Sequence, residues 1–464
     1  MFAKHIAWIG FTVAAVLVLC VCYVHLDEVS RILIVPTSRE LPTPMDKLRP
    51  TSHSMAALLM DTSEDETSSA QSEIHVYEGA GKLSEHANSS SEAEENVHRG
   101  NKVDVYTSLT ESEQLSVSEL PSASNASIGK GSSTHCQPAT HLVFLKMHKC
   151  SSSTVQNILF RYGEEHGLDF VLPPQGNYLG HSAFQRQYMM DFPVKEYNIL
   201  CHHTVFNAKA MAEVMPSDSV YVTILRDPVP MFESIFTYNT MAKIYRLPES
   251  RALELFLKKP EYYYGKQDGG ILHLRNPMLY GLGLPKGRLG NQAAIDGIIA
   301  DAQRQFDLVM MTEYFEESLV LLKHLMCWAT DDVVYFVVNA RSKTAVRPLS
   351  PQTAAQIRRW NRGDVKLYQA FNRTFWQKVQ AFGVDRMKRE VAELHERNQY
   401  YKQHCISRVI NDNAKVWHPP GVPIDSFKVK PEAMGDTMCV RMAEPELSYT
   451  KHLQDIQLKR YRMG

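Results

Sequence analysis

Five short, nearly uninterrupted apolar runs recur between residues 141 and 338. They read HLVFLKM, YNILCHH, SVYVTIL, FDLVMMT and VVYFVV, and they span residues 141–147, 197–203, 219–225, 306–312 and 333–338. Runs of this length without polar alternation are typical of strands that are covered on both faces. We therefore predict five strands in the interior of a sheet.

Segments with apolar residues at helical spacing lie between these runs. We predict helices over residues 153–165, 229–238, 293–304 and 315–327, and two or three more after Pro351, with breaks near Gly363 and Gly383. Alternating strands and helices favour an α/β fold with a doubly wound, mostly parallel sheet and C-terminal helices. We assign this domain to residues 136–406 and expect an irregular C-terminal tail over residues 407–464.

A different pattern precedes the predicted domain. Residues 6–26 form an uncharged apolar run, which as a helix would span roughly 30 Å, the thickness of a bilayer core. Lys4 precedes the run and acidic residues follow it, which places residues 1–5 in the cytosol and the remainder in the lumen. We predict a single-pass type II signal anchor. A cleaved signal peptide is the alternative, but its apolar region would be shorter and would end in small residues.

Residues 27–135 are rich in Ser, Thr and Glu, as in DTSEDETSSAQSE. Such a segment cannot bury enough apolar surface to fold, so we predict a disordered lumenal stem. N-glycosylation sequons at Asn88, Asn125 and Asn372 fit a lumenal body. Six cysteines lie beyond residue 135, and a lumenal compartment permits disulfides whose pairing the sequence does not specify. The formal net charge of −1 argues against nucleic acid as the main partner.

The first predicted strand runs into a loop with basic and hydroxyl residues and then into a helix. We call residues 148–154, HKCSSST, the phosphate loop. The N-terminus of a helix binds anions through its unpaired N–H groups, and Lys149 and the hydroxyl groups of Ser151, Ser152, Ser153 and Thr154 would add to this. The glycines of the triphosphate-binding Walker motif are absent, which favours a single phosphate. The alternative is a helix cap beside a solvated lysine.

A second strand-to-helix junction has similar chemistry. In VYVTILRDPVPMFES, Arg226 follows the predicted strand at the sheet edge where ligands of open α/β sheets bind. Ser234 lies about two turns into the following helix, so a guanidinium and a hydroxyl are placed to share a phosphate. The alternative is a structural ion pair of Arg226 with Asp227 and an ordinary helical serine. Two separate monophosphate sites on one sheet fit adenosine 3′,5′-bisphosphate.

The segments LVFLKMHKCSSSTVQNILFRYG, VTILRDPVPMFESIFTY, EYFEESLVLLKHLMCW and YFVVNAR resemble, in this order, the galactose 3-O-sulfotransferase family, which includes galactosylceramide sulfotransferase. The resemblance covers roughly residues 136–405. It implies a P-loop-like sulfotransferase fold and 3′-phosphoadenosine 5′-phosphosulfate (PAPS) as the co-substrate. One departure is Cys150, where the family usually has threonine.

The resemblance also assigns roles to residues of this chain. Lys149 and the hydroxyl residues Ser152, Ser153 and Thr154 would hold the 5′-phosphosulfate, and Arg226 and Ser234 would hold the 3′-phosphate. Arg341 in NARSK would close over the nucleotide, for which a surface salt bridge is the alternative. The acceptor would be the 3-hydroxyl of a terminal β-galactose on a glycolipid, such as galactosylceramide or lactosylceramide, or on a glycoprotein glycan, and the enzyme would lie in the Golgi membrane.

Sulfuryl transfer to a hydroxyl needs stabilisation of developing charge and a base, and fixed protein donors make a metal unnecessary. Lys149 is placed to stabilise the leaving oxygen. His202 and His203 end a predicted strand at the edge where both loops lie, and strand alternation turns only one of them toward the substrate. We predict that His203 is the base and that no metal takes part.

Two other kinds of enzyme remain alternatives. A sulfotransferase for another sugar, such as a glycosaminoglycan uronyl 2-O-sulfotransferase, would use the same donor, but its polyanionic acceptor would require a basic cleft. A Golgi glycosyltransferase would share the anchor and stem. Many of those use an Asp-x-Asp motif for a metal-bound sugar nucleotide, and this triplet does not occur after residue 135.

Overall fold

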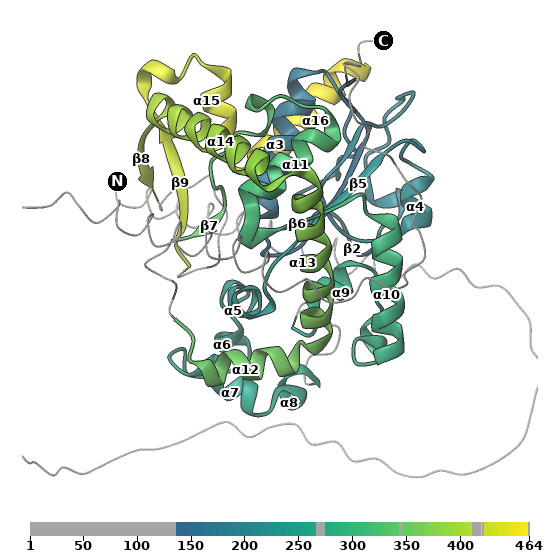
Figure 1. Ribbon diagram of the computed structural model, residues 1–464, viewed down its shortest axis with the longest axis vertical. Helices are drawn as coiled ribbons and strands as arrows, with labels where there is room; N and C mark the ends of the chain where they lie inside the picture. Colours follow the sequence, from purple (N-terminus) through teal and green to yellow (C-terminus); the bar gives the residue numbers. More distant parts are fainter. Residues whose placement is uncertain are drawn as a thin grey trace, which may run out of the picture. The chain divides into compact units, whose positions relative to one another are not determined.

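The computed structural model describes residues 136–265, 274–342, 346, 348–410, 419 and 422–462 (Figure 1). The predicted anchor, the predicted stem and the sequons at Asn88 and Asn125 lie outside these residues. Within the described part of the chain, no helix combines the length and apolar character that crossing a membrane requires.

Four parallel strands form the central sheet, in the order β3–β1–β5–β6. These strands are β1 (Leu142–Leu145), β3 (Ile199–Leu200), β5 (Val220–Leu225) and β6 (Leu308–Met311). In register, Leu142 lies opposite Ile199 on one side and Val220 on the other, and Val222 lies opposite Leu308. All residues of β1 and β6 are buried, as expected for strands covered on both faces. The predicted α/β class and parallel sheet are confirmed.

The strand order places a topological switch point between β1 and β5. The chain moves outward from β1 to β3 and then returns past β1 to form β5 and β6 on the other side. In open α/β sheets, ligands bind in the crevice at the carboxyl ends of the two strands that flank such a reversal. The phosphate loop follows β1, and the Arg226 loop follows β5. Both predicted phosphate-binding loops therefore lie at the switch point.

Helices connect and extend this sheet, and in Figure 1 α13 runs beside β6 while α14 continues toward α15. The helices up to residue 405 are α3 (Ser152–Glu165), α4 (Ala208–Ala212), α5 (Pro228–Tyr238), α6 (Met241–Ile244), α7 (Ala252–Lys258), α8 (Pro260–Gly265), α9 (Pro277–Gly281), α10 (Gln292–Gln305), α11 (Phe315–Met326), α12 (Pro351–Trp360), α13 (Arg362–Phe382) and α14 (Val384–Cys405). The predicted break at Gly383 is confirmed, since this glycine has φ of 99° between α13 and α14. The earlier break lies at Asn361 rather than at Gly363, which is already inside α13.

The predicted strand over residues 333–338 is wrong. A 3-10 turn, Asp331–Val333, leads into an irregular segment in which Val333, Val334 and Phe336 are buried. Its main chain bonds to side chains instead of to a neighbouring strand: Asn398 Oδ1 accepts from the Tyr335 N–H at 2.8 Å, and Arg161 donates to the Val334 carbonyl. The apolar run thus indicated burial correctly, but burial alone does not distinguish a strand from a packed irregular segment.

The predicted strand over residues 197–203 is interrupted. After β3, the chain leaves the central sheet and forms β4 (His203–Val205), which pairs with β2 (Tyr178–Ala183) in a separate two-stranded sheet. His203 lies opposite Tyr178 in this register. His202 and His203 lie at the junction between the two sheets. This junction, and not simple strand alternation, explains why their surroundings differ.

The segment after residue 406 is folded and not an irregular tail. It contains β8 (Ile406–Ile410), β9 (Ile424–Val429), α15 (Thr437–Met442) and α16 (Glu446–Arg462), and β9 pairs antiparallel with both β8 and β7 (Ala340–Arg341). Helices α15 and α16 pack against α3, directly behind the phosphate loop. Disulfides join Cys136 to Cys327 and Cys405 to Cys439, and the second ties α14 to α15. The C-terminal segment is therefore part of the same domain.

Candidate active site

The phosphate loop adopts a backbone conformation that explains how it works without glycine. Lys149 and Ser151 both have φ of 57°, the left-handed region that costs a non-glycine residue about 1–2 kcal/mol. Left-handed residues that alternate with ordinary ones turn successive N–H groups toward a common point and form an anion-binding nest. The loop enters α3 directly after Ser151, so the N-terminus of a 14-residue helix faces the same point. The geometry supports a single anionic group at this loop.

The side chains of the loop divide into two sets. Ser152 and Thr154 are buried, and they bond inside the protein: Ser152 Oγ donates to the Met147 carbonyl at 2.5 Å, and Thr154 Oγ1 accepts from the Val338 N–H at 3.3 Å. Cys150 is fully buried and its Sγ lies 3.7 Å from Met231 Sδ. Lys149, Ser151 and Ser153 are partly exposed. Ser152 and Thr154 were predicted as side-chain ligands of the donor. Their hydroxyl groups instead bond inside the protein, where they contribute to the shape of the loop.

Lys149 lies in a confined and electropositive position. Its ammonium is 3.9 Å from the centre of the Tyr238 ring, which attracts the cation. Burial, and secondarily the charge of Arg226, lowers the pKa of Lys149 to about 8. An incoming anion would offset this desolvation and raise the pKa of Lys149 toward its usual value.

The loop after β5 contacts the phosphate loop directly. Arg226 Nη1 donates to the Lys149 carbonyl at 2.9 Å, which joins the two loops across the switch point. Asp227 Oδ1 caps α5 by accepting from the Val229 N–H at 2.7 Å. The two residues thus have separate roles, which argues against a merely structural pair. Ser234 lies on α5 and is 9% exposed.

Arg341 reaches the same helix. Its Nη1 and Nη2 donate to Glu233 Oε1 and Oε2 at 2.9 and 2.6 Å, a two-pronged ion pair in which both side chains are mostly buried. Glu233 immediately precedes Ser234 on α5. The charge of Arg341 also acts on Lys149. The salt bridge considered as the alternative is therefore present, but it lies beside the predicted 3′-phosphate site and not on the open surface.

The two histidines at the end of β3 have different environments. His202 is fully buried, its Nε2 lies 3.1 Å from Thr450 Oγ1 of α16, and burial together with the charge of Lys146 lowers its pKa to about 3. His203 lies at the site: its Nδ1 is 3.0 Å from the Lys146 carbonyl and its Nε2 is 3.1 Å from the Lys146 ammonium. Of the two, only His203 contacts the end of β1 next to the phosphate loop, while its role as base stays a prediction.

Two site residues were missed by the sequence analysis. Lys146 was counted within an apolar strand, and Glu446 lies in the segment that was expected to be irregular. The Lys146 ammonium is 2.8 Å from Glu446 Oε2 and 3.3 Å from Ser153 Oγ, and Ser153 donates to the same carboxylate oxygen at 2.6 Å. A lysine at the end of an otherwise apolar strand was a usable signal for Lys146. No local pattern marks Glu446.

Aromatic rings line one side of His203. The His148 and His203 rings are parallel within 4°, with centroids 4.1 Å apart, and the Tyr178 ring lies 5.0 Å from His203. Tyr178 is 37% exposed, so part of this stack faces solvent. A partly exposed aromatic surface beside a candidate base suits the apolar face of a sugar ring.

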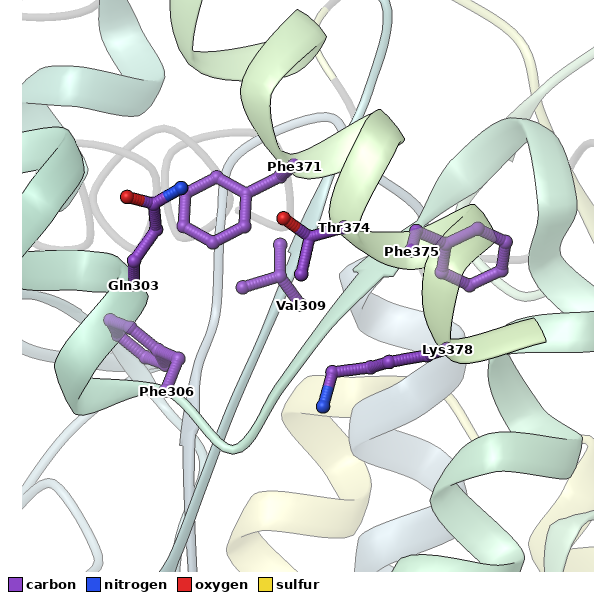
Figure 2. Close-up of a pocket in the computed structure, with 7 residues that line it drawn as sticks. All are labelled: Gln303, Phe306, Val309, Phe371, Thr374, Phe375 and Lys378. Carbon is purple, nitrogen blue, oxygen red and sulfur yellow. The ribbon is translucent and has the colours of Figure 1, made fainter. Parts of the chain in front are cut away.

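Two other features lie apart from these loops. A pocket of about 180 Å³ is formed by side chains of α10, β6 and α13, among them Phe306, Phe371 and Phe375 (Figure 2). It includes Thr374 of the Asn372 sequon, and Asn372 itself is half-buried within α13. Its lining contains no histidine or carboxylate, and no predicted donor-binding residue.

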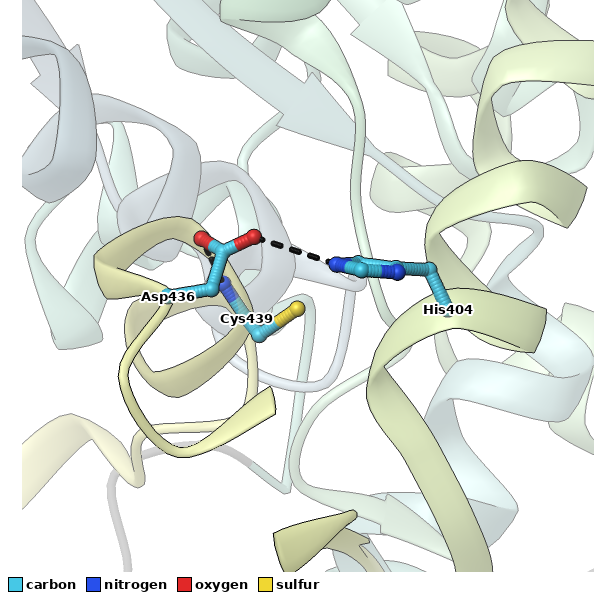
Figure 3. A group of neighbouring side chains, drawn as sticks. All are labelled: His404, Asp436 and Cys439. Atoms are coloured by element: carbon cyan, nitrogen blue, oxygen red, sulfur yellow. Dashed lines mark hydrogen bonds and ion pairs between the residues drawn. The ribbon is translucent and has the colours of Figure 1, made fainter. Parts of the chain in front are cut away.

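The second feature is a group of possible metal ligands, His404, Asp436 and Cys439 (Figure 3). Cys439 is bonded to Cys405, so its sulfur is not available as a thiolate ligand. His404 Nε2 lies 3.3 Å from Asp436 Oδ2, and Asp436 also caps α15. The arrangement is explained as a helix cap with an ion pair.

Comparison with known proteins extends this picture over most of the chain. The family model described as galactose-3-O-sulfotransferase matches residues 91–457. The match begins inside the predicted stem and runs through the C-terminal segment, so the family likeness does not end near residue 405 as expected.

Curated relatives agree with the family model. Galactosylceramide sulfotransferase of Mus musculus is 36% identical over 344 residues, which cover 71% of this chain and 81% of the relative. The protein of the same name from Bos taurus is 37% identical over 351 residues, with 72% and 82% covered. Galactose-3-O-sulfotransferase 2 of Sus scrofa is 36% identical over 334 residues, with 68% and 84% covered. With the two joined phosphate-binding loops already described, these matches show that the chain belongs to the galactose-3-O-sulfotransferase family of enzymes.

Proposed function

We propose that this enzyme transfers a sulfuryl group from PAPS to the 3-hydroxyl of a terminal β-galactose. The observation that supports this best is the pair of anion-binding loops at the switch point, joined by the hydrogen bond from Arg226 to the Lys149 carbonyl. One bisphosphate nucleotide has two separate phosphates to fill them. A nucleoside triphosphate would place its charge in one loop instead.

Each loop fits one end of the donor. The nest at Lys149 and Ser151, with Ser153, would hold the 5′-phosphosulfate, and Arg226 and Ser234 would hold the 3′-phosphate. Arg341 would act by fixing α5 through Glu233 next to Ser234. Ser152 and Thr154 would support the loop from within, and their main-chain N–H groups remain part of the nest.

The residues present account for the reaction without a metal. The acceptor oxygen forms a bond to sulfur while the bond between sulfur and the 5′-phosphate oxygen breaks, and that electron pair leaves with the bisphosphate. His203 Nε2 takes the proton of the acceptor hydroxyl, and Lys149 stabilises the charge on the departing oxygen. Lys149 follows β1, and His203 begins β4 and contacts Lys146 next to the end of β1, so the fold brings both groups to the same region.

The acceptor is proposed from the relatives and the aromatic stack. Three relatives are named for galactosylceramide and others for galactose 3-O-sulfation, which favours a galactose-terminated glycolipid or glycan. The exposed face of Tyr178 beside His203 offers a surface on which a sugar ring packs. A uronyl 2-O-sulfotransferase remains the alternative with the same donor chemistry.

The proposed location follows from residues outside the described part of the chain. The apolar run over residues 6–26 and the sequons support a single-pass type II protein of the Golgi membrane with its catalytic domain in the lumen. PAPS and a galactosylated acceptor would meet the enzyme in that compartment.

The test offers the purified full-length chain radiolabelled PAPS with a panel of acceptors: galactosylceramide, lactosylceramide, type 1 and type 2 galactosyl glycans, and a desulfated uronic acid polymer. We expect label on the galactose acceptors, and analysis of the product should place the sulfate on the 3-hydroxyl. Label on the uronic acid polymer alone would contradict the proposal and favour the alternative.

A further inference from the structure

A carboxylate from the C-terminal helix reaches the centre of the site. Glu446 is the first residue of α16, and its Oε2 accepts from both the Lys146 ammonium and the Ser153 hydroxyl, at 2.8 and 2.6 Å. The Lys146 side chain is fully buried and that of Glu446 is 19% exposed. Burial alone would raise the pKa of Glu446. The charge of Lys146 and the hydrogen bonds from Lys146 and Ser153 lower this pKa by more than burial raises it. The net shift is therefore downward, and the carboxylate is ionised at neutral pH.

The Lys146 ammonium links this carboxylate to the candidate base. It has three hydrogens, and it has three acceptors within reach: Glu446 Oε2, Ser153 Oγ and His203 Nε2 at 3.1 Å. The other ring nitrogen of His203 lies 3.0 Å from the Lys146 carbonyl, which can only accept. His203 is therefore held with its proton on Nδ1 and its lone pair on Nε2, the form that a general base requires.

Other contacts of α16 fix the position of Glu446. Tyr449 donates to Glu164 Oε2 at 2.6 Å, Gln454 donates to the Pro173 carbonyl at 2.6 Å, and Thr450 bonds to His202. One helix thus supports both histidines: it contacts His202 directly and reaches His203 through Lys146.

We infer that Glu446 is a positioning residue for His203, acting through Lys146. Its negative charge offsets the ammonium beside the imidazole, and its hydrogen bonds hold that ammonium in line with Nε2. The inference rests on the proposed sulfuryl transfer for the role of His203 as base. It adds that the C-terminal helix, and not only the two phosphate-binding loops, sets the protonation of the site.

The arrangement has a consequence for the order of events. Because the Lys146 ammonium lies 3.1 Å from Nε2, it must turn away before the imidazole accepts a proton from the acceptor. The anionic oxygens of a donor in the phosphate loop, next to Ser153, would be stronger acceptors for Lys146 than a neutral imidazole.

The test measures the protonation of His203 directly and does not depend on turnover. The titratable groups around His203 are Lys146 directly after β1, His148 and Lys149 from the phosphate loop, Tyr178 from β2 and Glu446 from α16.

In the full-length chain labelled with ¹³C-histidine, the His203 signal is assigned by its loss in His203→Gln, and its NMR titration midpoint is then compared between variants. Glu446→Gln keeps the shape and removes the charge, so the midpoint should fall by about one pH unit. Lys146→Met should move it in the opposite direction.

A matched control lies on the same helix. Asp455 pairs with Lys451 at 2.6 Å on the exposed side of α16, and Asp455→Asn should leave the His203 midpoint unchanged. An unchanged midpoint in a folded Glu446→Gln variant would overturn the inference. If neither site variant folds, the ¹⁵N shifts of wild-type His203 still test the arrangement: a protonated Nε2 would overturn the inference, because Lys146 could not then donate to that nitrogen. Absence of label on every acceptor would instead refute the proposed function and leave this result standing.

Discussion

The phosphate loop and the C-terminal segment both contribute to the site, but only the contribution of the loop can be recognised from its sequence. Residues 148–154 follow a strand, precede a helix and contain a lysine among hydroxyl residues, a combination whose chemistry is local. Residues 422–462 contain no comparable motif, yet Thr450 contacts His202 and Glu446 contacts Lys146, which in turn contacts His203. A function that depends on adjacent residues can be recognised from the sequence, whereas one that depends on contacts 248 and 300 residues apart along the chain requires the fold.

The two regions also differ in what holds them. The loop has a strained backbone at Lys149 and Ser151, and hydrogen bonds from Arg226 to the Lys149 carbonyl and from Ser152 to the Met147 carbonyl hold it. The C-terminal segment is held by packing against α3 and by the disulfide between Cys405 and Cys439. We therefore expect substitutions in the loop to act mainly on donor binding, and substitutions behind the histidines to act on protonation or stability.

The largest effect should follow from loss of the candidate base. His203→Ala should lower turnover by about 10²–10⁴-fold, because proton transfer from the acceptor is lost, and it should leave the affinity for adenosine 3′,5′-bisphosphate nearly unchanged. Turnover with PAPS and calorimetric binding of the bisphosphate measure the two quantities.

His202→Ala is the comparison: it leaves a buried cavity beside Thr450, so it should lower the thermal midpoint instead. Loss of turnover in a folded His202→Ala variant, with His203→Ala active, would show that the wrong histidine was chosen.

A tenfold effect is expected from pH through Lys149. Because burial and Arg226 lower its pKa to about 8, the ammonium is charged at pH 7 and mostly neutral at pH 9. A bound phosphate favours the charged form, so the bisphosphate affinity should fall roughly tenfold between pH 7 and pH 9. Lys149→Arg keeps its charge over this range, and its affinity should stay nearly flat. The same decline in both proteins would assign the pH dependence to another group.

The smallest effect should come from Cys150, the position of the phosphate loop at which the resemblance leads us to expect threonine. The Cys150 side chain packs against Met231 and does not point into the nest. Cys150→Thr should therefore change the bisphosphate affinity by less than about twofold, while the buried hydroxyl lowers the thermal midpoint. A large gain in affinity would show that a hydroxyl at this position reaches the phosphate.

The sequence predicted the parts of the fold that depend on local pattern. The strands that became β1, β5 and β6 and the helices around them were found, because each combines an apolar run with a clear boundary such as Asp227-Pro228. The run at residues 333–338 was misassigned because its main chain bonds to Asn398 and Arg161, which the sequence does not place nearby. Strand alternation predicted different surroundings for His202 and His203, and these differ, but because the chain changes sheets there; the role of His203 as base stays a prediction.

The site was predictable to a similar extent. Lys149 and Arg226 lie together as expected, since the carboxyl ends of the parallel strands β1 and β5 share one edge, whereas His203 reaches Lys146 from β4 of the second sheet. The side chains of Ser152 and Thr154 bond inside the protein, to the Met147 carbonyl and the Val338 N–H, and the second of these partners is far away in the sequence. Glu446 could not be found from its neighbours in sequence, because its role depends on the docking of α16 against α3.

The most direct test of the account compares the affinities of the wild-type chain for adenosine 3′,5′-bisphosphate and for adenosine 5′-monophosphate, together with the same pair for Arg226→Ala. We expect the wild type to prefer the bisphosphate by roughly 10- to 150-fold, since a charge-assisted bond to the 3′-phosphate contributes about 1.5–3 kcal/mol, and we expect Arg226→Ala to lose most of this preference. The exposed Arg358→Ala on α12 serves as the matched control and should keep it. Equal affinity of the wild type for the two nucleotides would contradict the assignment of the β5 loop as a phosphate site, and with it the claim that two joined loops bind one bisphosphate donor.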